Sequence, residues 1–125
     1  MAQIRENRVK AKLQRGEIAT LLMGDNSSPN TVDAQGPLGF DSVLIEGEHG
    51  PVDFGDIPNL TRACDLWGMT SVVRVNVNQP GVIYRTLDVG AQGVMVPHIN
   101  TKEEAQAVVE ATKFAPIGAR GMSNG

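Results

Sequence analysis

Four short apolar runs form the clearest pattern along this chain. They cover residues 18–23, 42–45, 70–75 and 93–96, and they begin 23 to 28 residues apart. Each run is followed by polar residues and then by apolar residues at helical spacing, which predicts four strand–loop–helix units. Because consecutive positions within each run are apolar, both faces of the predicted sheet are covered, as in parallel sheets with helices packed against them.

The helices between the runs are predicted from apolar stripes and end signals. Ile4, Val9 and Leu13 lie among basic residues and predict an amphipathic opening helix that ends at Gly16. Thr101 and Glu104 have the spacing of a capping box and predict the start of the last helix.

Two further helices are predicted over residues 57–67 and 82–87, and a weaker one over residues 31–38, where Gly36 and Pro37 limit it. Two architectures accommodate such a chain: an open doubly wound sheet and a closed (β/α)8 barrel.

Composition narrows the range of partners and compartments. The 125 residues are 41% hydrophobic and 20% charged, as in an ordinary globular domain. A net charge of −3, without a basic cluster, argues against a nucleic acid or an anionic membrane as partner. Cys64 is the only cysteine, which excludes an internal disulfide and indicates a reducing compartment, so we expect a cytoplasmic protein.

Ionisable side chains gather where the predicted strands end. Parallel sheets place their active sites at this edge, because the loops that follow the strands meet there. The pattern therefore predicts a catalytic mouth. It is formed by Asp25 and Asn26 after the first run, Glu46, Glu48 and His49 after the second, Arg74 and Asn76 at the third, and His98 after the fourth.

The segment from Glu46 to His49 carries the densest chemistry. Glu46 and Glu48 are two positions apart, so on an extended chain their carboxylates point to the same side, and Gly47 permits close approach of another backbone. Such a cluster could hold a metal, orient metal-bound water, or raise the basicity of His49. The alternative is a solvated loop with an ordinary histidine.

Arg74 ends the third run, where its guanidinium could bind a carboxylate and stabilise an enolate oxygen. The alternative is a structural ion pair with Glu46 or Glu48. For His98 we favour an ordinary loop histidine, and Asp88 has the position of a helix-end residue.

Four segments together resemble the 4-hydroxy-2-oxoheptanedioate and 2-dehydro-3-deoxyglucarate aldolases of the aldolase/citrate lyase superfamily. They are residues 40–49, 72–76, 87–97 and 115–121, in the same order. The resemblance implies an α/β fold of the (β/α)8 TIM-barrel type. Residues 1–125 would then be the N-terminal half of a single TIM-barrel aldolase domain, with the opening helix and about four βα units.

The resemblance implies reversible retro-aldol cleavage of a 2-keto-3-deoxy or 4-hydroxy-2-oxo acid to pyruvate and an aldehyde, with Mg2+, Mn2+ or Co2+ as cofactor. His49 matches the family's proton acceptor, Arg74 the arginine that steadies the enolate, and Asp88 an aspartate that raises the basicity of that histidine. Glu46, with Glu48 beside it, stands where the family more often has aspartate. Since Asp88 directly follows the helix predicted over residues 82–87, contact with His49 across a subunit interface is one route.

The family's metal-ligating carboxylates come from later strands, so we expect them C-terminal to Gly125 and none in this chain. The chain by itself is then expected to be inactive, with the remaining half of the barrel as its partner. The family habit implies a homo-oligomer, a hexamer, acting in aromatic or sugar acid catabolism. Two alternatives stay open: an acyl-CoA lyase of the malyl-CoA or citryl-CoA type, and a non-catalytic half-barrel.

Overall fold

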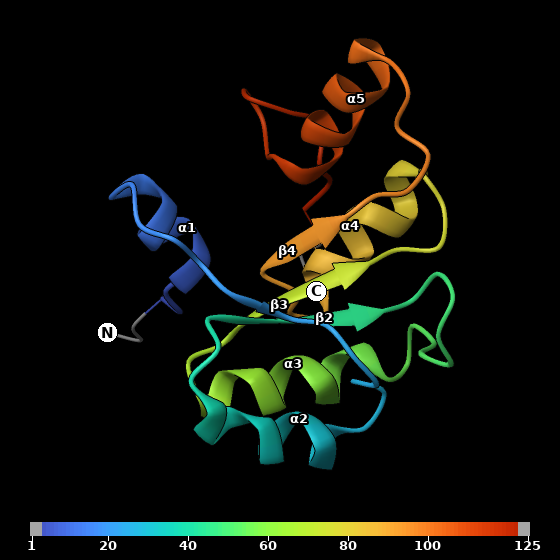
Figure 1. The fold of residues 1–125 in the computed structure, drawn as a ribbon. Coiled ribbons are helices and arrows are strands. Elements are labelled where there is room, and N and C mark those ends of the chain that lie inside the picture. Colours follow the sequence, from blue (N-terminus) through green and yellow to red (C-terminus); the bar gives the residue numbers. More distant parts are fainter. Residues whose placement is uncertain (1–3, 123–125) are drawn as a thin grey trace.

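A computed structural model describes residues 4–122 and contains one four-stranded parallel sheet (Figure 1). Its strands are β1 (Leu21–Leu22), β2 (Ser42–Glu46), β3 (Thr70–Arg74) and β4 (Gly93–Met95). Each strand pairs in parallel with the one that precedes it in sequence, so the spatial order is β1-β2-β3-β4. A doubly wound sheet reverses its strand order at a switch point, whereas a (β/α)8 barrel adds strands in sequence. The observed order is that of the barrel.

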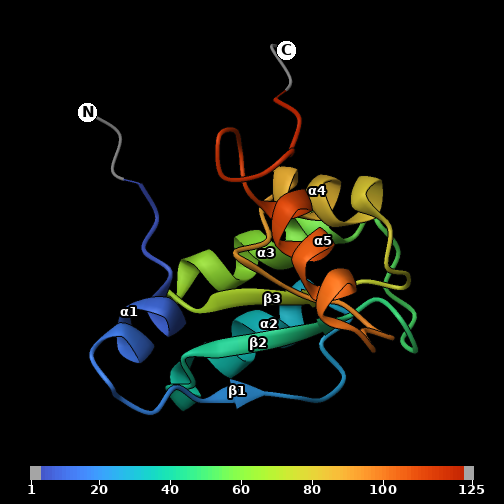
Figure 2. The ribbon, with the colours of Figure 1, turned by 90° about the horizontal axis from the view of Figure 1, so that it is seen from above.

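The helices alternate with the strands. They are α1 (Arg8–Gln14), α2 (Pro29–Gln35), the 3-10 helix η1 (Gly36–Leu38), α3 (Ile57–Leu66), α4 (Pro80–Asp88) and α5 (Lys102–Thr112). Helices α2 and α3 pack side by side, and so do α4 and α5 farther along the sheet (Figures 1 and 2). Within residues 4–122, no helix is both long and apolar enough to cross a membrane.

The core lies between the sheet and these helices. Val43, Ile45 and Val73 of the strands pack against Leu60 and Cys64 of α3. Because successive side chains of a strand point to opposite faces, the neighbouring positions of β2 and β3 face away from this core. In a barrel that second face lines the interior. Its last residues on β2 and β3 are Glu46 and Arg74.

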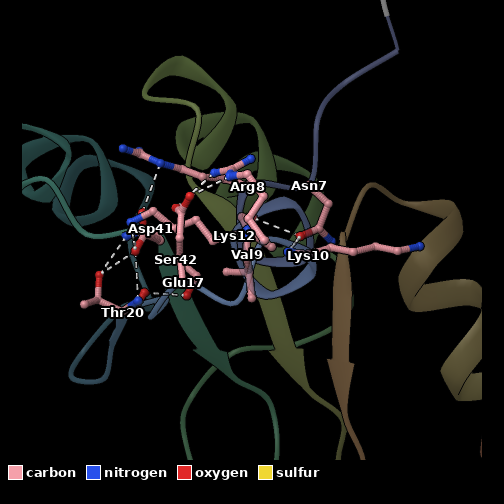
Figure 3. A network of polar contacts seen from close by, with 11 residues as sticks. Asn7, Arg8, Val9, Lys10, Lys12, Glu17, Thr20, Asp41 and Ser42 are labelled. Atoms are coloured by element: carbon pink, nitrogen blue, oxygen red, sulfur yellow. Dashed lines mark hydrogen bonds and ion pairs between the residues drawn. The ribbon is translucent and has the colours of Figure 1, made fainter.

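A buried carboxylate ties α1 to the sheet (Figure 3). Asp41, just before β2, accepts hydrogen bonds from Lys12 Nζ at 2.9 Å and from the Thr20 backbone N–H at 2.9 Å, and Arg8 Nε lies 3.1 Å from its other oxygen. The hydrogen bond from Lys12, helped by those from Thr20, lowers the pKa of Asp41 to about 2 although burial opposes this. This network holds α1 at the edge where the strands begin (Figure 1).

The opening helix is shorter than its apolar stripe predicted. It begins at Arg8, while Ile4 lies before it and is 93% exposed. Asn7 precedes the helix as its N-cap, and its side chain accepts the Lys10 backbone N–H at 2.9 Å. The first strand is also shorter, since it covers Leu21–Leu22 and leaves Ile18 exposed.

Other predictions from the sequence are confirmed. The capping box of α5 forms, with the Thr101 hydroxyl accepting the Glu104 N–H and the Glu104 carboxylate accepting the Thr101 N–H. The weak helix is real but divides into α2 and η1 at Gly36. Trp67 differs from the other residues of the apolar stripe predicted for the helix over residues 57–67. It is partly exposed, and its indole N–H donates to Asp33 at 2.6 Å.

Candidate active site

Glu46 and Arg74 form the centre of the candidate site. They end β2 and β3 as register partners. Arg74 Nε donates to Glu46 Oε1 at 2.9 Å, and Arg74 Nη2 pairs with Glu46 Oε2, so the contact is bidentate. The ion pair foreseen as the structural alternative for Arg74 is therefore present. The Arg74 hydrogen bond lowers the pKa of Glu46 to about 2, and Glu46 in turn raises the pKa of Arg74.

The loop after β2 folds back around Glu46. Glu46 Oε1 also accepts the backbone N–H groups of Glu48 at 2.8 Å and of His49 at 3.1 Å. Gly47 donates its N–H to the Arg74 carbonyl at 2.9 Å, and a Cβ at Gly47 would lie 2.7 Å from that oxygen. The expectation that Gly47 permits close backbone approach is thus confirmed. The carboxylates of Glu46 and Glu48 both face Arg74.

Glu48 connects the cationic and imidazole groups of the site. Its side chain is only 11% exposed, and its Oε2 lies 3.3 Å from Arg74 Nε and 3.5 Å from His49 Nε2. Its Oε1 lies 3.4 Å from His98 Nε2. Both imidazoles are largely exposed, at 72% for His49 and 81% for His98. One nearly buried carboxylate thus joins Arg74 at the end of β3 to the histidines that follow β2 and β4.

His98 joins the candidate site through Glu48. The sequence favours an ordinary loop histidine at this position, and in the structure its Nε2 lies 3.4 Å from Glu48 Oε1, at the same edge as Arg74 and His49. Its position directly after the fourth apolar run predicts this edge, since all strands of a parallel sheet end at one edge, but the sequence does not predict the contact with Glu48.

Asp88 lies apart from this cluster. It ends α4, which runs back toward the strand beginnings, and it accepts a hydrogen bond from Arg120 Nη2 at 2.6 Å. The Arg120 guanidinium also lies over the Phe114 ring, 4.6 Å from its centroid. Within the part of the chain that the structure describes, Asp88 and His49 are not in contact.

The loop after β1 contributes a wall of the site. Asn26 is buried and donates its amide to the Leu44 carbonyl at 2.8 Å, which fastens this loop to β2. A cavity of about 230 Å3 lies beside Glu46, between Asp25 and Asn26 on one side and Gly50 and Pro51 on the other. The loop thus leaves room for a small group next to the glutamate.

The described residues do not make a metal centre by themselves. Between residues 4 and 122, no group of three His, Cys, Asp or Glu side chains is arranged to hold a metal ion. Glu46 and Glu48 both contact Arg74, whose positive charge competes with any cation for their oxygens. We therefore derive no catalytic step through a metal from these residues.

Comparison with known proteins identifies the family of the chain. A model of the family described as HpcH/HpaI aldolase/citrate lyase matches residues 20–125. The chain belongs to this family. The resemblance read from its four segments is confirmed, and the fold is that of a TIM barrel, of which the described strands form half.

Three proteins illustrate the family relationship. The chain is 38% identical over 112 residues to 2-dehydro-3,6-dideoxy-6-sulfogluconate aldolase of Pseudomonas putida, a match that covers 90% of this chain and 43% of that protein. It is 38% identical over 120 residues to 5-keto-4-deoxy-D-glucarate aldolase of Escherichia coli, covering 94% and 46%. An HpcH/HpaI family structure from Burkholderia cenocepacia J2315 superposes with a TM-score of 0.85 at 31% identity, covering 94% and 49%.

The chain spans less than half the length of these curated relatives. The same share follows from the strands, because four of the eight strands of a barrel are present.

Proposed function

We propose that this chain supplies the enolate-binding and proton-accepting part of a divalent-metal-dependent aldolase. The reaction is reversible cleavage of a 2-keto-3-deoxy or 4-hydroxy-2-oxo acid to pyruvate and an aldehyde. The observation that carries the proposal is the contact of Arg74 with Glu46 and Glu48 at the carboxyl ends of β2 and β3, beside His49. The aldolase names of its relatives support it.

Arg74 binds the pyruvyl end of the substrate in this proposal. Glu46 and Glu48 hold its Nε and Nη2, which fixes the plane of the guanidinium before substrate arrives. The raised pKa of Arg74 keeps the group charged. Its Nη1 has no side-chain partner within residues 4–122 and is left for a substrate oxygen. A donor oriented in advance stabilises the enolate oxygen without further reorganisation.

His49 accepts the proton in this proposal. Its imidazole is exposed at the mouth and anchored to Glu48 through Nε2. The substrate hydroxyl at C4 gives its proton to the imidazole, the C3–C4 bond breaks, and its electron pair passes to the pyruvate enolate beside Arg74. The C4 fragment leaves as the aldehyde, and a proton added at C3 completes pyruvate.

The divalent metal, Mg2+, Mn2+ or Co2+, would polarise the keto oxygen when bound. We place its ligands in the remaining half of the barrel, C-terminal to Gly125.

Asp88 lies at the opposite end of the sheet, paired with Arg120 and 43% exposed. We therefore propose that it acts on His49 of a neighbouring subunit in a homo-oligomer, a hexamer, of a cytoplasmic catabolic enzyme.

The test is pyruvate release by the complete enzyme, meaning this chain joined to the remaining half of its barrel. A 4-hydroxy-2-oxo acid is supplied with Mn2+, and pyruvate is followed with and without a chelator. Metal-dependent release supports the proposal. Cleavage of malyl-CoA without pyruvate formation would favour the acyl-CoA lyase, and absence of both activities would favour a non-catalytic barrel.

A further inference from the structure

We propose that His98 determines which aldehydes the enzyme accepts, by offering its imidazole to a polar group on the aldehyde-derived end of the substrate. The proposal rests on the aldolase function above. It assigns to His98 a role in recognition, separate from the proton transfer of His49.

The backbone at His98 is held in an uncommon conformation. Its φ angle is 58°, in the left-handed region that few residues other than glycine adopt, although histidine enters it more readily than most. Asn100 donates its side-chain amide to the His98 carbonyl at 3.1 Å and supports this turn. Such conformations cost free energy, persist where their surroundings hold them, and gather at functional sites. Here the turn directs the imidazole toward Glu48.

The position of His98 relative to Arg74 indicates which part of the substrate it meets. His98 Nε2 lies 3.4 Å from one oxygen of Glu48, and Arg74 Nε lies 3.3 Å from the other. Arg74 and His98 therefore flank the same carboxylate. A keto acid whose pyruvyl end is bound by Arg74 has its distal carbons within reach of His98.

The two histidines differ in their partners. His49 and Arg74 contact the same oxygen of Glu48, Oε2, in keeping with the proposed role of His49 at the bond that breaks. His98 contacts Oε1, and its side chain is 81% exposed, so a ligand can approach it from the mouth. Because Nε2 of the His98 imidazole faces Glu48, its Nδ1 is left to accept a hydrogen bond from a ligand hydroxyl. It favours an aldehyde with a hydroxyl near the carbonyl over one with only an alkyl chain, because an alkyl chain that displaces water from Nδ1 leaves this nitrogen without a hydrogen-bond partner.

The experiment compares glycolaldehyde with propionaldehyde in the aldol direction, using pyruvate, Mn2+ and the complete enzyme. These aldehydes have nearly the same size and differ by a hydroxyl in place of a methyl group. The ratio of their kcat/KM values is measured for wild type, His98→Ala and His98→Gln, with Lys102→Ala, an exposed position at the start of α5, as the control. Exchange of the pyruvate C3 protons with D2O is followed in parallel, since it reports enolate formation without an aldehyde.

We expect His98→Ala to lower the preference for glycolaldehyde roughly tenfold, while His98→Gln keeps much of it and the exchange rate stays near that of wild type. An unchanged ratio in an active His98→Ala enzyme would overturn the role of His98 alone. A parallel fall in proton exchange in both variants would also overturn it, because His98 would then act on the enolate. Absence of exchange and of aldol addition in wild type would overturn the proposed function itself, and the role of His98 with it.

Discussion

Glu46 and Arg74 end neighbouring parallel strands as register partners, with Arg74 Nε 2.9 Å from Glu46 Oε1. Since Glu48 approaches the same nitrogen from the following loop, two carboxylates hold the guanidinium at the mouth of the half-barrel.

Replacing Arg74 with lysine should impair catalysis severely. Lysine keeps the charge but cannot reproduce the bidentate contact with Glu46 and still present a nitrogen to substrate. We expect kcat/KM for aldol cleavage by the complete enzyme to fall. The fall corresponds to a loss of roughly 2 to 4 kcal/mol of transition-state stabilisation. Arg62→Lys is the matched control, because Arg62 pairs with Asn59 on the surface of α3. Turnover equal to wild type in Arg74→Lys would remove the arginine from the mechanism.

Replacing His49 with alanine should slow cleavage but not affect metal binding. Loss of a general base costs about 10² or more in rate, and in our proposal His49 is not a metal ligand. The measurements are kcat with saturating substrate and metal affinity by calorimetric titration of the complete enzyme. If metal affinity falls together with the rate, His49 belongs among the metal ligands.

Gly47→Ala should damage the site through the backbone. A Cβ at Gly47 would lie 2.7 Å from the Arg74 carbonyl, which accepts the Gly47 N–H, so the loop must move away from β3. We expect the variant to lose activity. We also expect its free energy of unfolding to fall by roughly 1 to 3 kcal/mol, as at other overpacked positions. Gly55→Ala is the control, because nothing lies within 4 Å of its Cβ position. Equal urea-unfolding midpoints for the two variants would contradict the prediction.

Asp41→Asn should destabilise the fold in a pH-dependent manner. The native pKa of Asp41 is lowered from 3.8 to about 2, so its contribution is complete above pH 3.8 and is lost as pH falls toward 2. Above that range the variant should lose about 2 kcal/mol, typical of hydrogen bonds to a charged group.

Urea unfolding of wild type and Asp41→Asn between pH 2 and pH 6 measures this difference, which should shrink at the acid end. Asp65→Asn is the control, because its partner Arg5 is half exposed and such pairs contribute little. A difference that is constant with pH would show that ionisation of Asp41 is not its source.

The 125-residue chain by itself should be inactive and should self-associate. In the described structure β4 pairs with β3 and has no strand on its other edge, and Met95 at its end is 38% exposed. Exposed edges of this kind recruit further strands. We expect negligible pyruvate release with excess Mn2+, an oligomer by light scattering, and recovery of activity when the second half of the barrel is added. Robust metal-dependent turnover by the chain alone would show that the site is complete here.

The sequence by itself determined the class of the fold and the edge that carries the site. Apolar runs such as residues 70–75 predict buried parallel strands because hydrophobic burial acts on local segments, and the Thr101–Glu104 capping box marks a helix start for the same local reason. The strand ends then locate Glu46, His49 and Arg74 at one edge. Local patterns failed at Ile4, where the Asn7 cap starts the helix later than the apolar spacing indicates.

Only the tertiary structure decided which of these groups meet. Glu46 and Arg74 are 28 residues apart in the chain, and their contact depends on the register of β2 against β3. Glu48 reaches His98 because the loops after β2 and β4 turn toward each other, whereas Asp88 is carried by α4 to the opposite end, where Arg120 binds it. Register and loop direction are set by the packing of distant segments, so the residues of any one segment carry no record of these contacts.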